Sequence, residues 1–163
     1  MDDIIAAAKV LRTLPTVDPQ RIYLGGHSTG GTLALLVAEM TGDFRGVFAF
    51  GPVDDVSGYP GEYLPFDTSN PKELELRSPG YWLSSIRSPV WVIEGADGNI
   101  DSLRAMKSAN KNPLVHFIEV DGASHFSVLG PVNELIAGKI HKDTGPNSNI
   151  TITSEEAGKL FRR

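Results

Sequence analysis

The stretch YLGGHSTGG, residues 23–31, lies between two segments of different character. RIYL, residues 21–24, is typical of a short buried strand, and TLALLVAEM, residues 32–40, is apolar nearly all round, as in a helix packed on a sheet. A sharp strand-to-helix turn exposes a serine to a base, and glycines two positions before and after it relieve crowding. The pattern Gly26-x-Ser28-x-Gly30 therefore predicts a nucleophile elbow. The simpler alternative is a glycine-rich turn with an incidental serine.

Strand and helix patterns alternate along the rest of the chain. Strand patterns occupy 47–50, 89–93 and 115–120, and helical patterns occupy 2–14, 102–109 and 131–141. This alternation predicts an α/β fold, with a parallel sheet between two layers of helices.

Two further regions interrupt this alternation. Residues 53–80, rich in proline, glycine, tyrosine and aspartate, are expected to form an inserted loop region within a main domain over 1–142. Residues 143–163 are expected to be a polar linker and a short C-terminal helix.

Composition limits the classes of partner. The 163 residues suit one domain, and a net charge of −5 without a long basic stripe argues against nucleic acid. The apolar runs are far shorter than the ~20 residues of a membrane helix, so no membrane partner is expected. The absence of cysteine excludes disulfides and thiolate metal sites, and fits a cytoplasmic location.

The carboxyl ends of the strands are where parallel sheets bind ligands. Ser28, Asp97 and His125 each follow one of the expected strands. Because these ends lie along one edge of the sheet, the three side chains are expected to meet there.

Three stretches resemble the α/β-hydrolase superfamily, in particular its prolyl-oligopeptidase-like and dienelactone-hydrolase-like branches. They are VDPQRIYLGGHSTGGTLALLVAE (17–39), PVWVIEGADGNI (89–100) and VHFIEVDGASHF (115–126). The resemblance extends over about residues 2–140, and the order Ser…Asp…His is the one that this fold uses.

The resemblance implies a serine hydrolase that acts on an ester or peptide-like acyl substrate through an acyl-enzyme. Ser28 would be the nucleophile, His125 the general base and then the acid, and Asp97 the group that orients the imidazole. The N–H of Thr29 would be one oxyanion donor. Neither a metal nor a cofactor is expected.

Other histidines and acids compete for these roles. The His27 side chain should point away from Ser28, His116 lies within a strand, and His141 lies on the last helix. Glu94 comes at the end of the strand around 89–93 and is a candidate to support the site indirectly, through other residues.

Two more carboxylates have ordinary local explanations. Asp101 suits a helix cap, and Asp121 suits a turn. Asp97 therefore remains the preferred acid.

The family fold has eight strands, and the chain is expected to supply the last four. The loop that usually gives a second oxyanion N–H would then be missing, and the strand 21–24 would have a bare edge able to pair with another copy. The alternatives are a fragment of a longer protein and an impaired hydrolase that serves as a binding module. Five aromatic residues are candidates to line the substrate pocket, and ordinary packing is the simpler explanation for them: Tyr59, Tyr63, Phe66, Tyr81 and Trp82.

Overall fold

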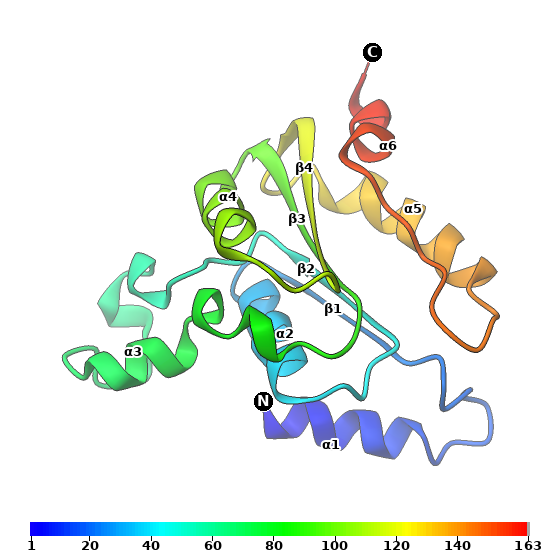
Figure 1. The fold of residues 1–163 in the computed structure, drawn as a ribbon, viewed down its shortest axis with the longest axis horizontal. Coiled ribbons are helices and arrows are strands. Elements are labelled where there is room, and N and C mark those ends of the chain that lie inside the picture. Colours follow the sequence, from blue (N-terminus) through cyan, green and yellow to red (C-terminus); the bar gives the residue numbers. More distant parts are fainter. Residues whose placement is uncertain (163) are drawn as a thin grey trace.

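A computed structural model describes residues 1–162, in which a four-stranded parallel sheet lies between two layers of helices (Figure 1). The strands are adjacent in the order β1-β2-β3-β4. Their bounds are β1 Tyr23–His27, β2 Gly46–Phe50, β3 Val90–Asp97 and β4 Val115–Ser124. The predicted parallel sheet flanked by helices is confirmed.

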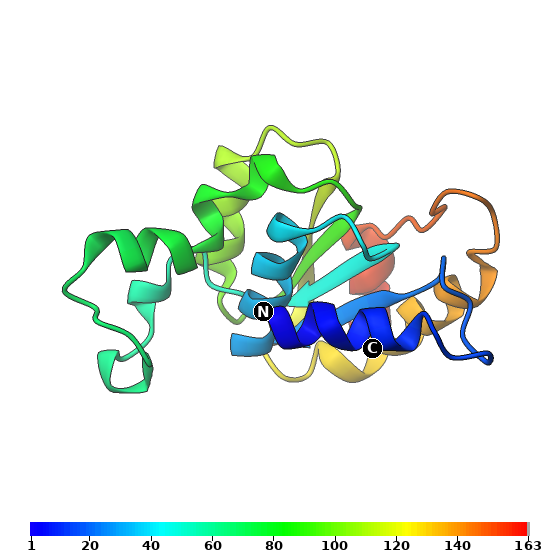
Figure 2. The same cartoon turned by 90° about the horizontal axis from the view of Figure 1, so that it is seen from below.

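Helices alternate with these strands. The α-helices are α1 Asp2–Leu11, α2 Thr29–Met40, α3 Pro71–Arg77, α4 Ile100–Ala109, α5 Leu129–Lys142 and α6 Ser154–Gly158. Short 3-10 turns occupy Val56–Gly58, Gly61–Tyr63, Pro79–Tyr81, Leu83–Ser85 and Lys159–Phe161. The segment between β2 and β3, which includes the expected loop region 53–80, thus holds α3 and four of these turns, and Figure 2 shows the part around α3 projecting from the body. Within residues 1–162, no helix is both long and apolar enough to cross a bilayer.

Alternation along the strands builds two cores. In β2, Val47 and Ala49 pack toward α1, α2 and α4, whereas Phe48 and Phe50 pack toward α5 and α6. Every residue of β2 is buried. A strand covered on both faces must be apolar throughout, which is why its sequence shows a continuous apolar run.

A row of aromatic rings crosses the α5 face of the sheet, one from each strand. Phe48 stacks on Trp91 with ring centroids 5.0 Å apart, and Trp91 stacks on His116 at 5.5 Å. Tyr23 lies beside Phe48 at 6.3 Å. The row fixes the lateral register of the strands, since each such pair adds about 0.5–1.5 kcal/mol beyond its buried area.

Three strands extend further along the chain than predicted: β3 to Asp97 and, with more consequence for the site, β1 and β4. β1 continues through the glycines to His27 because Gly25 and Gly26 pair with Phe48 and Ala49 of β2. β4 continues to Ser124, past the turn expected at Asp121-Gly122. The residues that follow these strands, Ser28 and His125, therefore begin at the rim of the sheet.

The C-terminal segment packs on the body of the protein. Asp143 is fully buried and accepts two hydrogen bonds of 2.7 Å from the Arg45 guanidinium. Ile150, Ile152 and Ala157 are buried in the core on the α5 side. The segment over 143–162 is thus held by charge at its start and by apolar contacts further along.

Candidate active site

Ser28 occupies a strained turn between β1 and α2. It has φ 57° and ψ −121°, and it is the one non-glycine residue with positive φ among residues 1–162. Its N–H donates to the Phe50 carbonyl at 2.8 Å, and its carbonyl accepts from the Thr32 N–H at 2.9 Å. Such a conformation costs about 1–3 kcal/mol and persists only where the surroundings enforce it. The conformation of Ser28 is therefore enforced by one hydrogen bond to β2 and one to the first turn of α2.

The crowding around this turn falls on Gly26 and Gly31. A Cβ at Gly26 would overlap the Gly30 carbonyl, and a Cβ at Gly31 would overlap the Phe50 carbonyl. At Gly30, no atom of residues 1–162 beyond its chain neighbours and the backbone of its own helix would lie within 4 Å of a Cβ. The expectation that Gly30 relieves a collision is thus not met. The reason is that α2 begins directly after Ser28, so that Gly31, one position later, is the residue that faces β2.

Thr29 is the first residue of α2 and is exposed. The N–H groups of the first helical turn have no acceptor within the helix, and the helix dipole adds positive potential there. The predicted oxyanion donor is therefore at a helix end suited to a developing negative charge.

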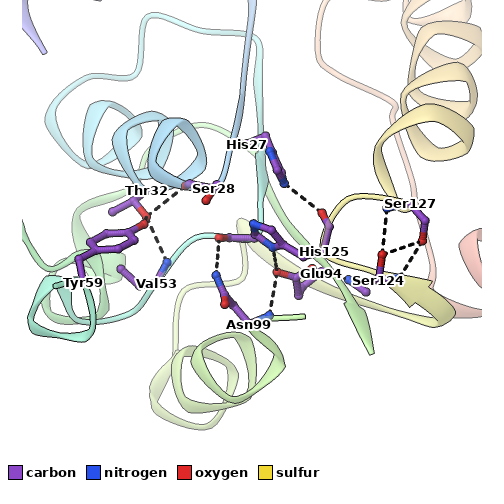
Figure 3. Close-up of polar contacts among 12 residues, drawn as sticks. His27, Ser28, Thr32, Val53, Tyr59, Glu94, Asn99, Ser124, His125 and Ser127 are labelled. Atoms are coloured by element: carbon purple, nitrogen blue, oxygen red, sulfur yellow. Dashed lines mark hydrogen bonds and ion pairs between the residues drawn. The ribbon is translucent and has the colours of Figure 1, made fainter. Parts of the chain in front are cut away.

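His125 follows β4 and is bound to Glu94. Its Nδ1 lies 2.8 Å from the Glu94 Oε2, and the Glu94 side chain is almost completely buried (Figure 3). The carboxylate also accepts from the N–H of Gly95 at 2.7 Å and from the N–H of Asn99 at 3.1 Å. A buried carboxylate needs such partners, and here they also fix its direction toward the imidazole.

Asp97, the acid preferred from the sequence, lies elsewhere. It is exposed at the end of β3, where it pairs in register with Ser124 of β4. No hydrogen bond joins it to His125 among the described residues. The difference arises because β3 continues to Asp97, with a register irregularity after Gly95, and thereby places Glu94 rather than Asp97 behind the imidazole. The sequence did contain a signal for Glu94, because it follows an apolar run. A carboxylate buried at such a place needs hydrogen-bonding partners, and this need could have indicated a role in the site.

Gly51 is a site residue that the sequence did not suggest. It follows β2 with φ +55°, and a Cβ there would lie 2.6 Å from both the His125 Nδ1 and the Glu94 Oε2. Its carbonyl accepts from the Asn99 side-chain amide at 3.2 Å. Gly51 therefore forms a backbone surface on which the His125–Glu94 pair rests.

Ser28 and His125 come from opposite ends of the strand order but lie near each other. The ring of His27, next to Ser28 in the chain, has its centroid 4.4 Å from that of His125. In Figure 3 the His125 ring lies between Ser28 and Glu94. No Ser28–His125 hydrogen bond forms within residues 1–162, and such bonds often tighten only when substrate is bound.

The remaining histidines and acids lie outside this cluster. His116 stacks on Trp91 within the aromatic row, and His141 is exposed on α5. Asp101 is in the first turn of α4, whose N-cap is Asn99. Asp121 is exposed within β4. Over residues 1–162, no three His, Asp or Glu side chains are grouped so that they could hold a metal ion.

A mostly apolar cavity of about 470 Å³ begins beside Thr29. The Tyr59 hydroxyl lies 3.0 Å from the Thr32 hydroxyl within its wall, and burial raises the pKa of Tyr59. Of the five aromatic candidates for pocket lining, three border this cavity: Tyr59, Tyr63 and Phe66. Tyr81 and Trp82 border other hollows.

The parallel sheet, the strained serine between strand and helix, and the histidine after the last strand together define an α/β-hydrolase fold reduced to its last four strands. The model of the prolyl oligopeptidase family matches residues 1–90, and the chain belongs to this family. No curated protein matches the chain.

Solved structures support the same fold. Dipeptidyl peptidase 4 of Porphyromonas gingivalis is 24% identical, with a TM-score of 0.68 over 86% of this chain and 22% of that one. A puromycin-hydrolyzing peptidase of Mycobacterium tuberculosis is 24% identical, with a TM-score of 0.64 over 76% of this chain and 22% of that one. An acylaminoacyl peptidase is 12% identical, with a TM-score of 0.69 over 99% of this chain and 29% of that one. The chain thus spans less than a third of the length of each of these structures.

Proposed function

We propose that the protein is a serine hydrolase of the peptidase type, in which Ser28 attacks the carbonyl of an ester or peptide-like acyl substrate. The observation that carries this proposal is the strained Ser28 at the start of a helix, close to an imidazole backed by a buried carboxylate. Membership of the prolyl oligopeptidase family supports the same class of reaction.

The reaction would begin with proton transfer. The Nε2 of His125 takes the proton of the Ser28 hydroxyl as its oxygen bonds to the substrate carbonyl carbon, and Glu94 stabilises the imidazolium through Nδ1–H. The tetrahedral oxyanion accepts a hydrogen bond from the Thr29 N–H. When the intermediate collapses, His125 returns the proton to the leaving amine or alcohol. Water then repeats the sequence on the acyl-enzyme and releases the acid and the free serine.

We assign to Glu94 the orienting role for which Asp97 was the sequence-based candidate. The 2.8 Å contact with Nδ1 supports this, and so do the two N–H groups that keep the carboxylate in place. Glutamate has one more methylene than aspartate, and this extra length suits a residue inside the strand rather than in the loop after it.

The cavity beside Thr29 would receive the acyl part of the substrate. Leu33, Leu36 and Val56 contribute apolar wall, and Tyr59 and Phe66 contribute aromatic wall. An apolar acyl group or side chain is the group that such a lining favours, because its burial gains about 25 cal/mol per Å² of apolar surface.

A fluorophosphonate probe tests the proposal, since it reacts with activated serines. We expect the wild-type chain and the exposed-site control Ser108→Ala to be labelled and Ser28→Ala to remain unlabelled. Labelling of Ser28→Ala at another residue would contradict the assignment.

The second candidate is a catalytically impaired hydrolase that acts as a binding module or must associate with another chain to complete its sheet. It is favoured by the free edge of β1, which among the described strands pairs with β2 alone. A wild-type chain that is folded by circular dichroism yet unlabelled would support this candidate over the hydrolase.

A further inference from the structure

The position of His125 poses a mechanical problem. Ser28 follows β1 and His125 follows β4, and these strands lie at opposite ends of the order β1-β2-β3-β4. Three spacings between neighbouring strands amount to roughly 14 Å. The segment after β4 must therefore turn back over the ends of β3 and β2 and be held there.

Bonds within this segment fix its shape. The Ser124 N–H donates to the Ser127 hydroxyl at 2.8 Å, the Ser127 N–H donates to the Ser124 hydroxyl at 3.2 Å, and the Val128 N–H donates to the Ser124 carbonyl at 3.2 Å. These bonds make 124–128 a compact turn, but none of them joins it to β1.

His27 makes that connection. Its Nε2 lies 3.0 Å from the carbonyl oxygen of His125, and the two rings are tilted by 40° with centroids 4.4 Å apart (Figure 3). Phe126 packs edge-on against both rings, at 5.4 Å from His27 and 5.0 Å from His125. A carbonyl oxygen can only accept, so Nε2 must carry the proton in this contact.

We propose that His27 is a positioning residue that holds the His125 turn at the distance from Ser28 that proton transfer requires. The inference rests on the function proposed above. His27 directly precedes Ser28 in the chain. A hydrogen bond from its ring to the His125 backbone therefore fixes the position of the general base relative to the strand that carries the nucleophile. An error of about 1 Å in such a geometry can cost ~10²-fold in rate.

Two substitutions separate the hydrogen bond from the packing. His27→Phe keeps an aromatic ring but removes the donor, and His27→Gln keeps a nitrogen donor near the place of Nε2. We expect His27→Phe to speed amide hydrogen exchange over 124–129 about tenfold, as for the loss of one net hydrogen bond. We expect it to slow fluorophosphonate labelling of Ser28 by ~10–100-fold. His27→Gln should restore both rates to within about threefold of wild type, a rescue that packing alone would not produce.

The outcomes are separable. Equal exchange over 124–129 in wild type and His27→Phe would overturn the inference, and so would faster exchange with an unchanged labelling rate. A wild-type chain that is not labelled would count against the proposed function, and the exchange rates would still decide whether His27 holds the turn.

Discussion

The Glu94 Oε2 lies 2.8 Å from the Nδ1 of His125, and the two residues come from neighbouring strands of the sheet. The pair joins a buried acid to a histidine whose side chain is 17% exposed, so part of the imidazole remains accessible from outside. This is the arrangement in which an acid fixes a tautomer and supports a charged imidazole.

Replacing Glu94 by glutamine should therefore reduce turnover of an ester substrate, or labelling of Ser28, by ~10³–10⁴-fold, because an amide no longer selects the reactive tautomer. The matched control is Asp97→Asn, three positions away and exposed, which should stay within about threefold of wild type. A large loss in Asp97→Asn with little change in Glu94→Gln would restore Asp97 to the orienting role. The rates are measured as probe labelling against time.

A side chain at Gly51 should displace the His125–Glu94 pair. The added Cβ of Gly51→Ala would lie 2.6 Å from atoms of both residues, and the backbone φ of +55° is itself strained for alanine. We expect labelling of Ser28 to fall by ~10²-fold while the chain stays folded. Gly58→Ala is the control, since within residues 1–162 no atom beyond its chain neighbours would lie within 4 Å of the added Cβ. Unchanged labelling in Gly51→Ala would mean that the pair does not need this backbone surface.

Local patterns were enough to predict the sheet and the position of Ser28. The apolar run of β2 and the glycines around Ser28 determine structure within a few residues, so their consequences follow from the sequence. The expected place of His125 after the last strand follows from the topology of parallel sheets.

The choice between Glu94 and Asp97 depended on tertiary structure. Glu94 lies within β3 and Asp97 ends it, and which one faces His125 is set by how far the strand pairs with β4 and by the irregularity after Gly95. The role of Gly51 was hidden for the same reason, because residues 51, 94 and 125 meet only when three strands are assembled.

The buried pair Arg45–Asp143 should govern stability at low pH. The hydrogen bond from Arg45 is the main cause that holds the pKa of Asp143 well below its ordinary value. A depressed pKa adds stability above the unfolded value of about 3.9, and this stability is lost as pH falls below it. Asp143→Asn should lower the free energy of unfolding by about 3 kcal/mol at pH 7. It should also make the free energy of unfolding depend less steeply on pH at low pH. Urea titrations from pH 2 to 7 measure this free energy, and Glu134→Gln, at an exposed position, is the control. If the free energy of unfolding of Asp143→Asn fell as steeply at low pH as that of the wild type, the prediction would be contradicted.

The free edge of β1 should allow two copies of the chain to associate. The Ser28 N–H points toward β2, so alternation directs the N–H groups of Tyr23, Gly25 and His27 to the open side. Val10 and Leu11 of α1 add exposed apolar surface. Gly25→Lys fits sterically, because the nearest atom to its Cβ is 3.9 Å away, and an edge lysine opposes strand pairing.

Sedimentation velocity over a range of concentrations measures this association. We expect wild type to form dimers and Gly25→Lys to shift toward monomer. Gly138→Lys adds the same charge on α5 and should behave as wild type, because outside its own helix no atom of the described residues lies within 4 Å of its Cβ position. Equal dimerisation of Gly25→Lys and wild type would show that the β1 edge is not the contact.

Glu39 on α2 should weaken the fold as pH rises. Both oxygens of its carboxyl are buried and have no hydrogen-bond partner within residues 1–162, and burial raises its pKa to about 9. The unfolded chain ionises this group near pH 4.3, so the folded state loses stability as pH increases from there toward 9. Glu39→Gln stays neutral, and at pH 7 it should be more stable than wild type by on the order of 2 kcal/mol, with little difference near pH 4. Denaturation midpoints measured from pH 4 to 9 test this, with Glu75→Gln at an exposed position as the control. If the midpoints of Glu39→Gln and wild type changed in parallel with pH, the Glu39 carboxyl would be solvated or paired in solution.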